Sequence, residues 1–99
     1  MAYRVRLSTE AERHFTYLSA RQRSIVLEAL RVQLRREPLR ETRNKKVLRP
    51  NPLAPWELRI GAVRVFYEVD AEEADVVNVL AIGMKTAHRL FIAGEEVRI

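Results

Sequence analysis

The segment WELRIGAVRVFYEVD, residues 56–70, most constrains the fold of this chain. Two runs of alternating apolar and polar residues flank the pair Gly61-Ala62. A period of two is typical of strands that bury one face. Glycine followed by any residue suits a two-residue type II′ turn, so the segment predicts a β-hairpin. This turn also sets the register: it places Arg59 opposite Arg64 on one face, and the apolar face is expected to pack on helices.

The N-terminal half predicts one strand and two helices. Residues 3–7 alternate, which indicates a strand, and Thr9 and Glu12 have the spacing of a capping box before a short helix. Apolar residues at helical spacing, with Val26, Leu27, Leu30 and Leu34 as the apolar stripe, predict a second helix over residues 21–37. Pro38 is expected to end it, because proline lacks the amide donor that a helix needs.

The rest of the chain predicts a sheet. Residues 38–55 contain four prolines and no apolar period, so we expect an ordered basic loop. Residues 76–82 are almost wholly apolar, as in a central strand, and Gly83 is expected to end that strand. Beyond residue 84 a short edge strand or a final turn is expected. The order β-α-α-β-β-β predicts one α+β domain over residues 1–99, an antiparallel sheet with a helical hairpin packed on one face.

Positive charge is concentrated in one region. The chain has a net charge of +5, and residues 31–49 hold two glutamates against a basic set made of Arg31, Arg35, Arg36, Arg40, Arg43, Lys45, Lys46 and Arg49. A local positive field of this kind suits nucleic acid, although a solvated helix end and loop would show the same composition. If RNA binds, Lys45 and Lys46 are expected to contact its phosphates.

Several classes of function find no support in the composition. The chain has no cysteine, which fits a reducing cytoplasm, and only three glycines, too few for a glycine-rich nucleotide site. It shows no paired-histidine metal motif and no apolar run long enough to span a membrane. We therefore expect no metal, no cofactor and no membrane association.

The facing arginines are the first candidate site. Like charges directly opposite each other destabilise a strand pair, so Arg59 and Arg64 suggest a clamp for phosphate. The alternative is that each arginine pairs with Glu57, Glu68 or another neighbour.

Two residues after the last strong strand are further candidates. Lys85 is a cation, and His88 can act as a general base or can be a plain surface residue. His14 is expected on the surface of the first helix. Trp56 is expected to be a core anchor rather than a platform for a base.

In its order of motifs the chain resembles the RelE/ParE toxin superfamily. The motifs are an initial YRV strand, a helical hairpin that ends at a proline, a basic loop, the run LRIGAVRVFYEVD, a valine-rich strand ending in IGMK, and a closing RLFIAGEEV. The resemblance implies the toxin of a type II toxin–antitoxin pair, with a RelB-like antitoxin as partner in a hetero-oligomer. RelE-type members cut mRNA in the ribosome without a metal, whereas ParE-type members inhibit DNA gyrase.

The resemblance also implies roles for single residues. Arg64 matches an arginine that stabilises the transition state, and Lys85 stands where RelE has an arginine. Phe91 stands at the place of a catalytic tyrosine, and Glu57 and Pro55 stand at the places of two lysines.

The first hypothesis is therefore a cytoplasmic, ribosome-dependent mRNA endonuclease. Its catalytic residues would be Arg64, Lys85 and His88, with Glu57 as an alternative base, and its RNA contacts would be Arg59, Lys45, Lys46, Arg43, Arg49 and Arg89. The alternatives are a ParE-like gyrase inhibitor and a catalytically degenerate toxin that only binds its antitoxin.

Overall fold

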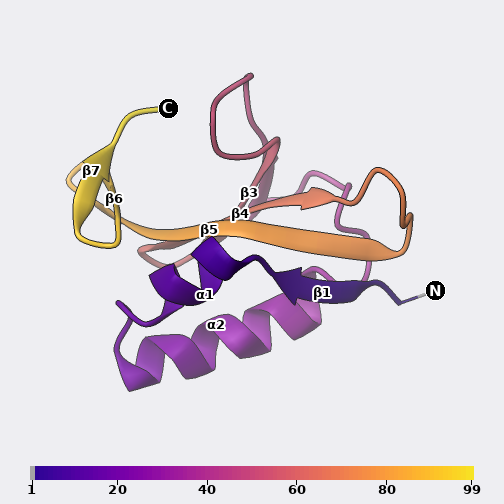
Figure 1. The fold of residues 1–99 in the computed structure, drawn as a ribbon, viewed down its shortest axis with the longest axis horizontal. Helices are drawn as coiled ribbons and strands as arrows, with labels where there is room; N and C mark the ends of the chain where they lie inside the picture. Colours follow the sequence, from indigo (N-terminus) through magenta and orange to yellow (C-terminus); the bar gives the residue numbers. More distant parts are fainter. Residues whose placement is uncertain (1) are drawn as a thin grey trace.

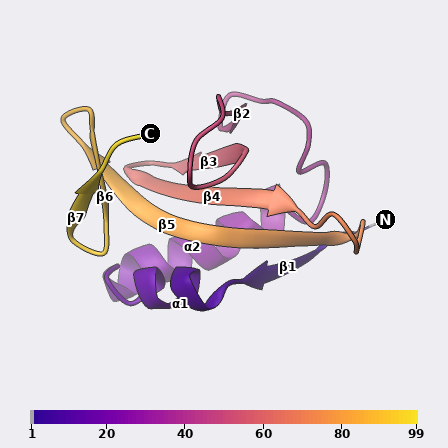
Figure 2. The same ribbon diagram turned by 45° about the horizontal axis from the view of Figure 1, so that its top comes forward.

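The computed structural model describes residues 2–99 and shows helices on one face of a strongly curved sheet. The elements of this region are β1 (Arg4–Leu7), α1 (Thr9–Phe15), α2 (Ala20–Gln33), β2 (Lys45–Val47), β3 (Trp56–Ile60), β4 (Val63–Val69), β5 (Val76–Thr86), β6 (Arg89–Ile92) and β7 (Glu95–Val97). The strand order is β2-β3-β4-β5-β6-β7, and β1 also pairs with β5. Figures 1 and 2 show α1 and α2 together under the sheet, which confirms the α+β prediction.

The β3–β4 hairpin has the predicted register. Arg59 pairs with Arg64, Trp56 pairs with Tyr67, and Gly61 in the turn has a φ of 60°. The rings of Trp56 and Tyr67 stack with their centroids 6.0 Å apart. Both side chains belong to the core between sheet and helices, so Trp56 is the core anchor that the sequence predicts.

Each helix begins at a serine. The side chain of Ser8, rather than that of Thr9, accepts a hydrogen bond from the third residue beyond it, Ala11. Ser19 forms a full capping box with Gln22 and so begins α2. Within α2, Val26 and Leu30 are buried as predicted, but Leu27 is exposed because the buried face is narrower than the apolar stripe.

The strand β5 is longer than the sequence predicts, because it continues through Gly83 to Thr86. A Cβ atom at Gly83 would lie 2.7 Å from the carbonyl oxygen of Phe91 and 2.8 Å from Cγ1 of Ile92. Glycine thus serves there for close packing against β6 and does not end the strand. The pairing of β1 with β5 is parallel, whereas all the other strand pairs are antiparallel.

Two regions contain strands that the sequence analysis did not separate from loops. The short strand β2 lies inside the predicted loop 38–55 and pairs with β3. After β5, the strands β6 and β7 form a hairpin that stands at the end of the sheet (Figure 1), and Leu90 and Ile92 of β6 pack in one cluster with Phe66 and Ala81. The turns before and after β6, Ala87-His88 and Ala93-Gly94, have positive φ at both residues, as type I′ turns require.

His14 is buried and not on the surface as predicted. Its Nδ1 accepts a hydrogen bond of 3.2 Å from the backbone N–H of Ile82, which ties α1 to β5. Burial lowers the pKa of His14, with a further decrease from Arg13 and an opposing effect of Glu10. Neither α1 nor α2 has the length and apolar character to cross a membrane.

Candidate functional site

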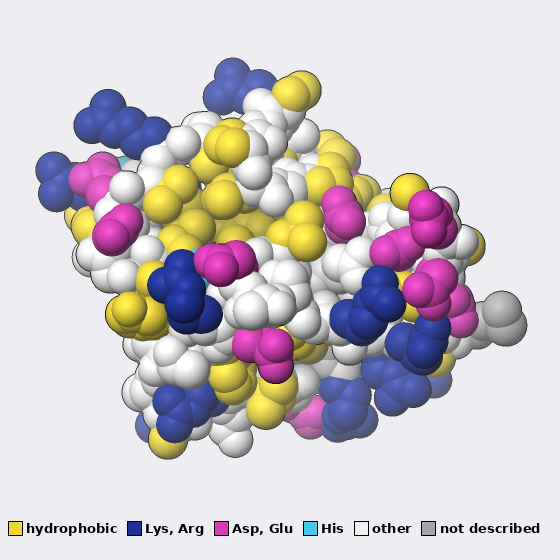
Figure 3. Space-filling model, viewed as in Figure 1, with side chains coloured by type: hydrophobic (Ala, Val, Ile, Leu, Met, Phe, Trp, Pro, Cys, Tyr) yellow, Lys and Arg dark blue, Asp and Glu magenta, His cyan; other side chains and the backbone are white. Residues whose placement is uncertain are grey.

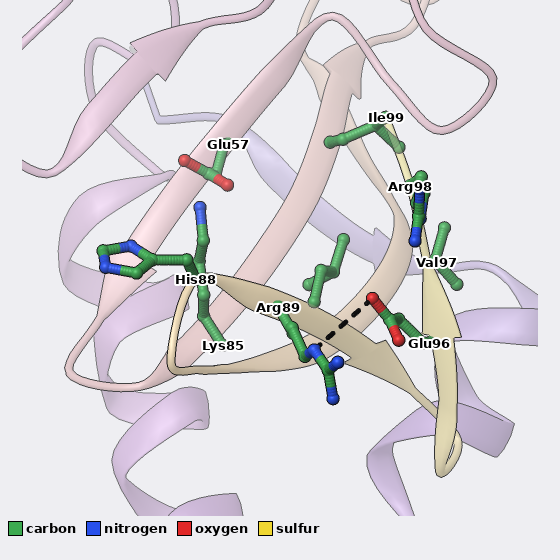
Figure 4. Close-up of a pocket in the computed structure, with 9 residues that line it drawn as sticks. Glu57, Lys85, His88, Arg89, Glu96, Val97, Arg98 and Ile99 are labelled. Carbon is green, nitrogen blue, oxygen red and sulfur yellow. Dashed lines mark ion pairs between the residues drawn. The ribbon is translucent and has the colours of Figure 1, made fainter.

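A pocket of about 410 Å³ lies over the sheet face that the helices leave free. One wall carries four polar side chains from β3, β5, the following turn and β6, namely Glu57, Lys85, His88 and Arg89. The other wall comes from the β6–β7 hairpin and the residues after it, namely Leu90, Glu96, Val97, Arg98 and Ile99. Figure 4 shows Lys85 extending toward Glu57, with His88 beside it. The structure thus brings together the sequence candidates Lys85, His88, Arg89 and Glu57.

Backbone geometry explains why these side chains meet. The amide of Lys85 donates a 2.8 Å hydrogen bond to the carbonyl of Ala62, so the end of β5 lies beside the β3–β4 turn. His88 has a φ of 67° and Ala87 a φ of 49°, a left-handed pair without glycine or asparagine. Backbone strain of this kind is concentrated at functional sites. The turn presents an exposed imidazole at the mouth of the pocket.

Glu57 connects the pocket to the two facing arginines. Its side chain is only 7% exposed, its Oε1 lies 2.9 Å from Nε of Arg59, and its Oε2 lies 3.9 Å from Nε of Arg64. The negative charge between two guanidiniums compensates the like-charge pair that the register creates. Pairing with Glu57, one of the two alternatives from the sequence, is the arrangement in this structure.

Arg64 lies deeper than a phosphate contact would. Its side chain is 15% exposed, and its Nη1 donates to the carbonyl oxygens of Gly61 at 2.6 Å and Val63 at 3.1 Å. Among residues 2–99 its buried Nε finds no hydrogen-bond acceptor. Burial lowers the pKa of Arg64, with Glu57 opposing that effect. Arg64 is not among the side chains that line the pocket. It would therefore act on bound RNA by positioning Glu57.

Lys45 corrects one prediction. Its side chain is buried, and Nζ donates to the carbonyl oxygens of Gln33 at 3.2 Å and Glu37 at 3.0 Å. Gln33 is the last residue of α2, where carbonyls have no helical partner, and Glu37 lies four residues farther along the chain. Lys45 therefore holds the helix end in place and is not exposed to RNA, contrary to our expectation.

The other predicted RNA contacts remain accessible. Lys46 is half-buried and pairs in register with Glu57, whereas Arg43, Arg49, Arg59 and Arg89 are exposed. Figure 3 shows Lys and Arg side chains around hydrophobic side chains gathered on the upper face of the molecule. Lys46, Arg59 and Arg89 lie on β2, β3 and β6, and Arg43 and Arg49 lie before and after β2.

Comparison with known proteins identifies the family. No family model matches the chain, and no curated protein does. The crystal structure of the toxin–antitoxin complex RelBE2 from Mycobacterium tuberculosis contains a similar chain, with 32% identity and a TM-score of 0.72. The match covers 86% of this chain and 93% of that chain. This chain belongs to the RelE-like toxins of the RelE/ParE superfamily.

The site of this RelE-like toxin has one wall that sequence reasoning missed. Leu90, Val97 and Ile99 contribute apolar surface, and Glu96 contributes a carboxylate. The sequence signal there was weak because β6 and β7 are short, with four and three residues. The pair Ala93-Gly94 was the usable signal, since it ends in the glycine that such a turn favours.

The donor groups at this RelE-like site are of several kinds. Within residues 2–99, no group of three or more His, Cys, Asp or Glu side chains is arranged to hold a metal ion. The pocket wall instead provides one carboxylate, one imidazole and two cations. This donor set suits proton transfer and phosphate binding.

Proposed function

We propose that this RelE-like toxin is a ribosome-dependent mRNA endonuclease that uses side chains alone. The observation that carries the proposal is the pocket wall on which Glu57, Lys85 and His88 lie together. A carboxylate can accept a proton, an ammonium can neutralise a phosphate, and an imidazolium can donate a proton. Each of the three accelerates cleavage of RNA by its own 2′-hydroxyl.

In the proposed reaction, Glu57 takes the proton of the 2′-hydroxyl. The 2′ oxygen then forms a bond to phosphorus, and the bond from phosphorus to the 5′ oxygen breaks, which leaves a cyclic 2′,3′-phosphate. His88, in its protonated form, gives a proton to the departing 5′ oxygen. An imidazole suits this role because it exchanges protons near neutral pH.

Cations carry the electrostatic part of the reaction. Lys85 on the pocket wall neutralises the charge that grows on the phosphoryl oxygens. Arg64 and Arg59 hold the carboxylate of Glu57 in place. Arg64 is thus a positioning residue in this proposal.

The proposed partners follow from the charge distribution and from the related structure. Lys46, Arg43, Arg49, Arg59 and Arg89 would contact the phosphates of ribosomal RNA and mRNA in the cytoplasm. The related chain belongs to a toxin–antitoxin complex, and we propose that a RelB-like antitoxin binds this toxin in a hetero-oligomer.

A reconstituted translation system tests the proposal. Purified toxin is added to ribosomes that carry a defined mRNA, and the RNA fragments are mapped, with the same mRNA free in solution as a control. The proposal predicts cuts in the ribosome-bound mRNA alone. Inhibition of gyrase supercoiling without RNA cuts would instead establish the ParE-like alternative, and loss of both activities would indicate a degenerate toxin.

A further inference from the structure

The two walls of the pocket differ in chemistry. The wall with Glu57, Lys85 and His88 suits a phosphate and its proton transfers, whereas the opposite wall combines aliphatic side chains with Glu96 and Arg98 (Figure 4). Glu57 already supplies the base of the proposed reaction, so the carboxylate of Glu96 on the second wall needs another explanation. Ligand sites combine apolar side chains with a few placed polar groups that fix the orientation of the ligand.

The aliphatic part of this wall is accessible. Leu90 is buried at its base, Val97 is half-buried, and the Ile99 side chain keeps 49% of its surface exposed. An exposed isoleucine beside cationic side chains offers an apolar face that a nucleobase can cover. Enzymes that act on nucleotides hold the base between aromatic or apolar side chains in this way.

Glu96 has free acceptors. Its only ion-pair partner among the described residues is Arg89, with Nε at 3.9 Å from Oε2, and neither carboxylate oxygen accepts a hydrogen bond within residues 2–99. Its side chain is 35% exposed. The two oxygens of one carboxylate can accept hydrogen bonds from two parallel N–H donors, which gives a bidentate pair.

We propose that Leu90, Val97, Ile99 and Glu96 form a subsite for the base next to the cleaved phosphate, and that Glu96 selects guanine. Guanine carries two adjacent donors, N1–H and the N2 amino group, on one edge. Cytosine and adenine offer one exocyclic amino group, and uracil offers a single ring N–H. This assignment deepens the proposed function, since it takes the phosphate wall as given.

Binding of nucleoside 3′-monophosphates tests the subsite without any cleavage. These probes carry base and phosphate as on the 5′ side of a cut bond. Calorimetric titration of the purified toxin is expected to show guanosine 3′-monophosphate binding about tenfold more tightly than uridine 3′-monophosphate. Inosine 3′-monophosphate, which lacks the N2 amino group, should fall between them.

Two variants separate Glu96 from general charge effects. Glu96→Gln should bring the guanosine and uridine affinities within about twofold of each other, because the amide presents only one acceptor. Glu95→Gln removes the same charge from the neighbouring residue of β7, which does not line the pocket, and should keep the tenfold ratio. Equal affinities in the unaltered toxin, no binding of either nucleotide, or equal effects of the two variants would overturn the subsite. A guanine preference in a toxin that cuts no mRNA would support the subsite and reject the proposed function.

Discussion

Nε of Arg59 lies 2.9 Å from Oε1 of Glu57, two residues earlier on β3, and donates a hydrogen bond to it. Glu57 is nearly enclosed, while Arg59 still reaches solvent. This contact lets two arginines face each other across the hairpin, because the carboxylate lies between them and Arg64 is on its other side. The same carboxylate lines the pocket, so Glu57 contributes both to stability and to the proposed activity.

Glu57→Gln should therefore lower the free energy of unfolding by about 1–3 kcal/mol, since a charged hydrogen bond is weakened and the arginine pair loses its compensation. Urea denaturation measures the change. In the double variant Glu57→Gln/Arg59→Gln the loss should be smaller, because the repulsion is removed as well. Glu68→Gln on β4 is the matched control and should cost less, and an equal cost would refute the special role of Glu57.

Lys45→Met should destabilise the protein by about 1–3 kcal/mol, because the carbonyls of Gln33 and Glu37 lose a buried donor. Thermal unfolding detects this loss, and Arg43→Gln, a change at an exposed cation, serves as the control. Unchanged stability together with weaker RNA binding would mean that Lys45 contacts RNA after all.

Gly83→Ala should cost about 1–3 kcal/mol, because the added methyl group would overlap the backbone of β6. Gly61→Asn is the comparison, since nothing lies within 4 Å of a Cβ there and asparagine tolerates the left-handed region. Calorimetry should show a clear decrease in Tm for the first variant and a small one for the second. Similar decreases would contradict the close approach of β5 and β6.

His14 should make stability depend on pH. Its folded-state pKa is lowered from the ordinary 6.5 by burial, so the unfolded chain binds a proton more readily. Stability is then complete above about pH 6.5 and decreases as the pH falls from that value through the lowered folded-state pKa. Denaturant titrations across this range should show the decrease. His14→Gln should reduce the slope of the free energy of unfolding against pH. A slope that His14→Gln leaves unchanged would assign the effect to other groups.

Local rules predicted the hairpin and could not predict the burial of polar side chains. Gly61-Ala62 determines both turn and register, so the opposition of Arg59 and Arg64 followed from neighbouring residues alone. Lys45 and His14 become buried through backbone partners at distant positions in the chain, Gln33 and Ile82. Such partners leave no periodic pattern, which explains why both were expected at the surface.

Only one wall of the candidate site was predicted, because the other wall forms only when distant parts of the chain come together. Lys85, His88 and Glu57 were candidates because of their residue type and their place near predicted strands. The wall with Glu96 and Ile99 was missed, since it depends on how the β6–β7 hairpin folds back over the sheet. The prediction for Gly83 was wrong because a glycine after an apolar run can end a strand or allow close packing, and only the three-dimensional contact distinguishes the two.

Primer extension on mRNA from cells that express the toxin tests whether it cleaves mRNA during translation. We expect cuts within translated codons, a loss of these cuts by about a hundredfold in Lys85→Gln at equal protein level, and no loss in Arg21→Gln on the helical side. Growth arrest in which translated mRNA stays intact would show that the toxin is not an mRNA endonuclease.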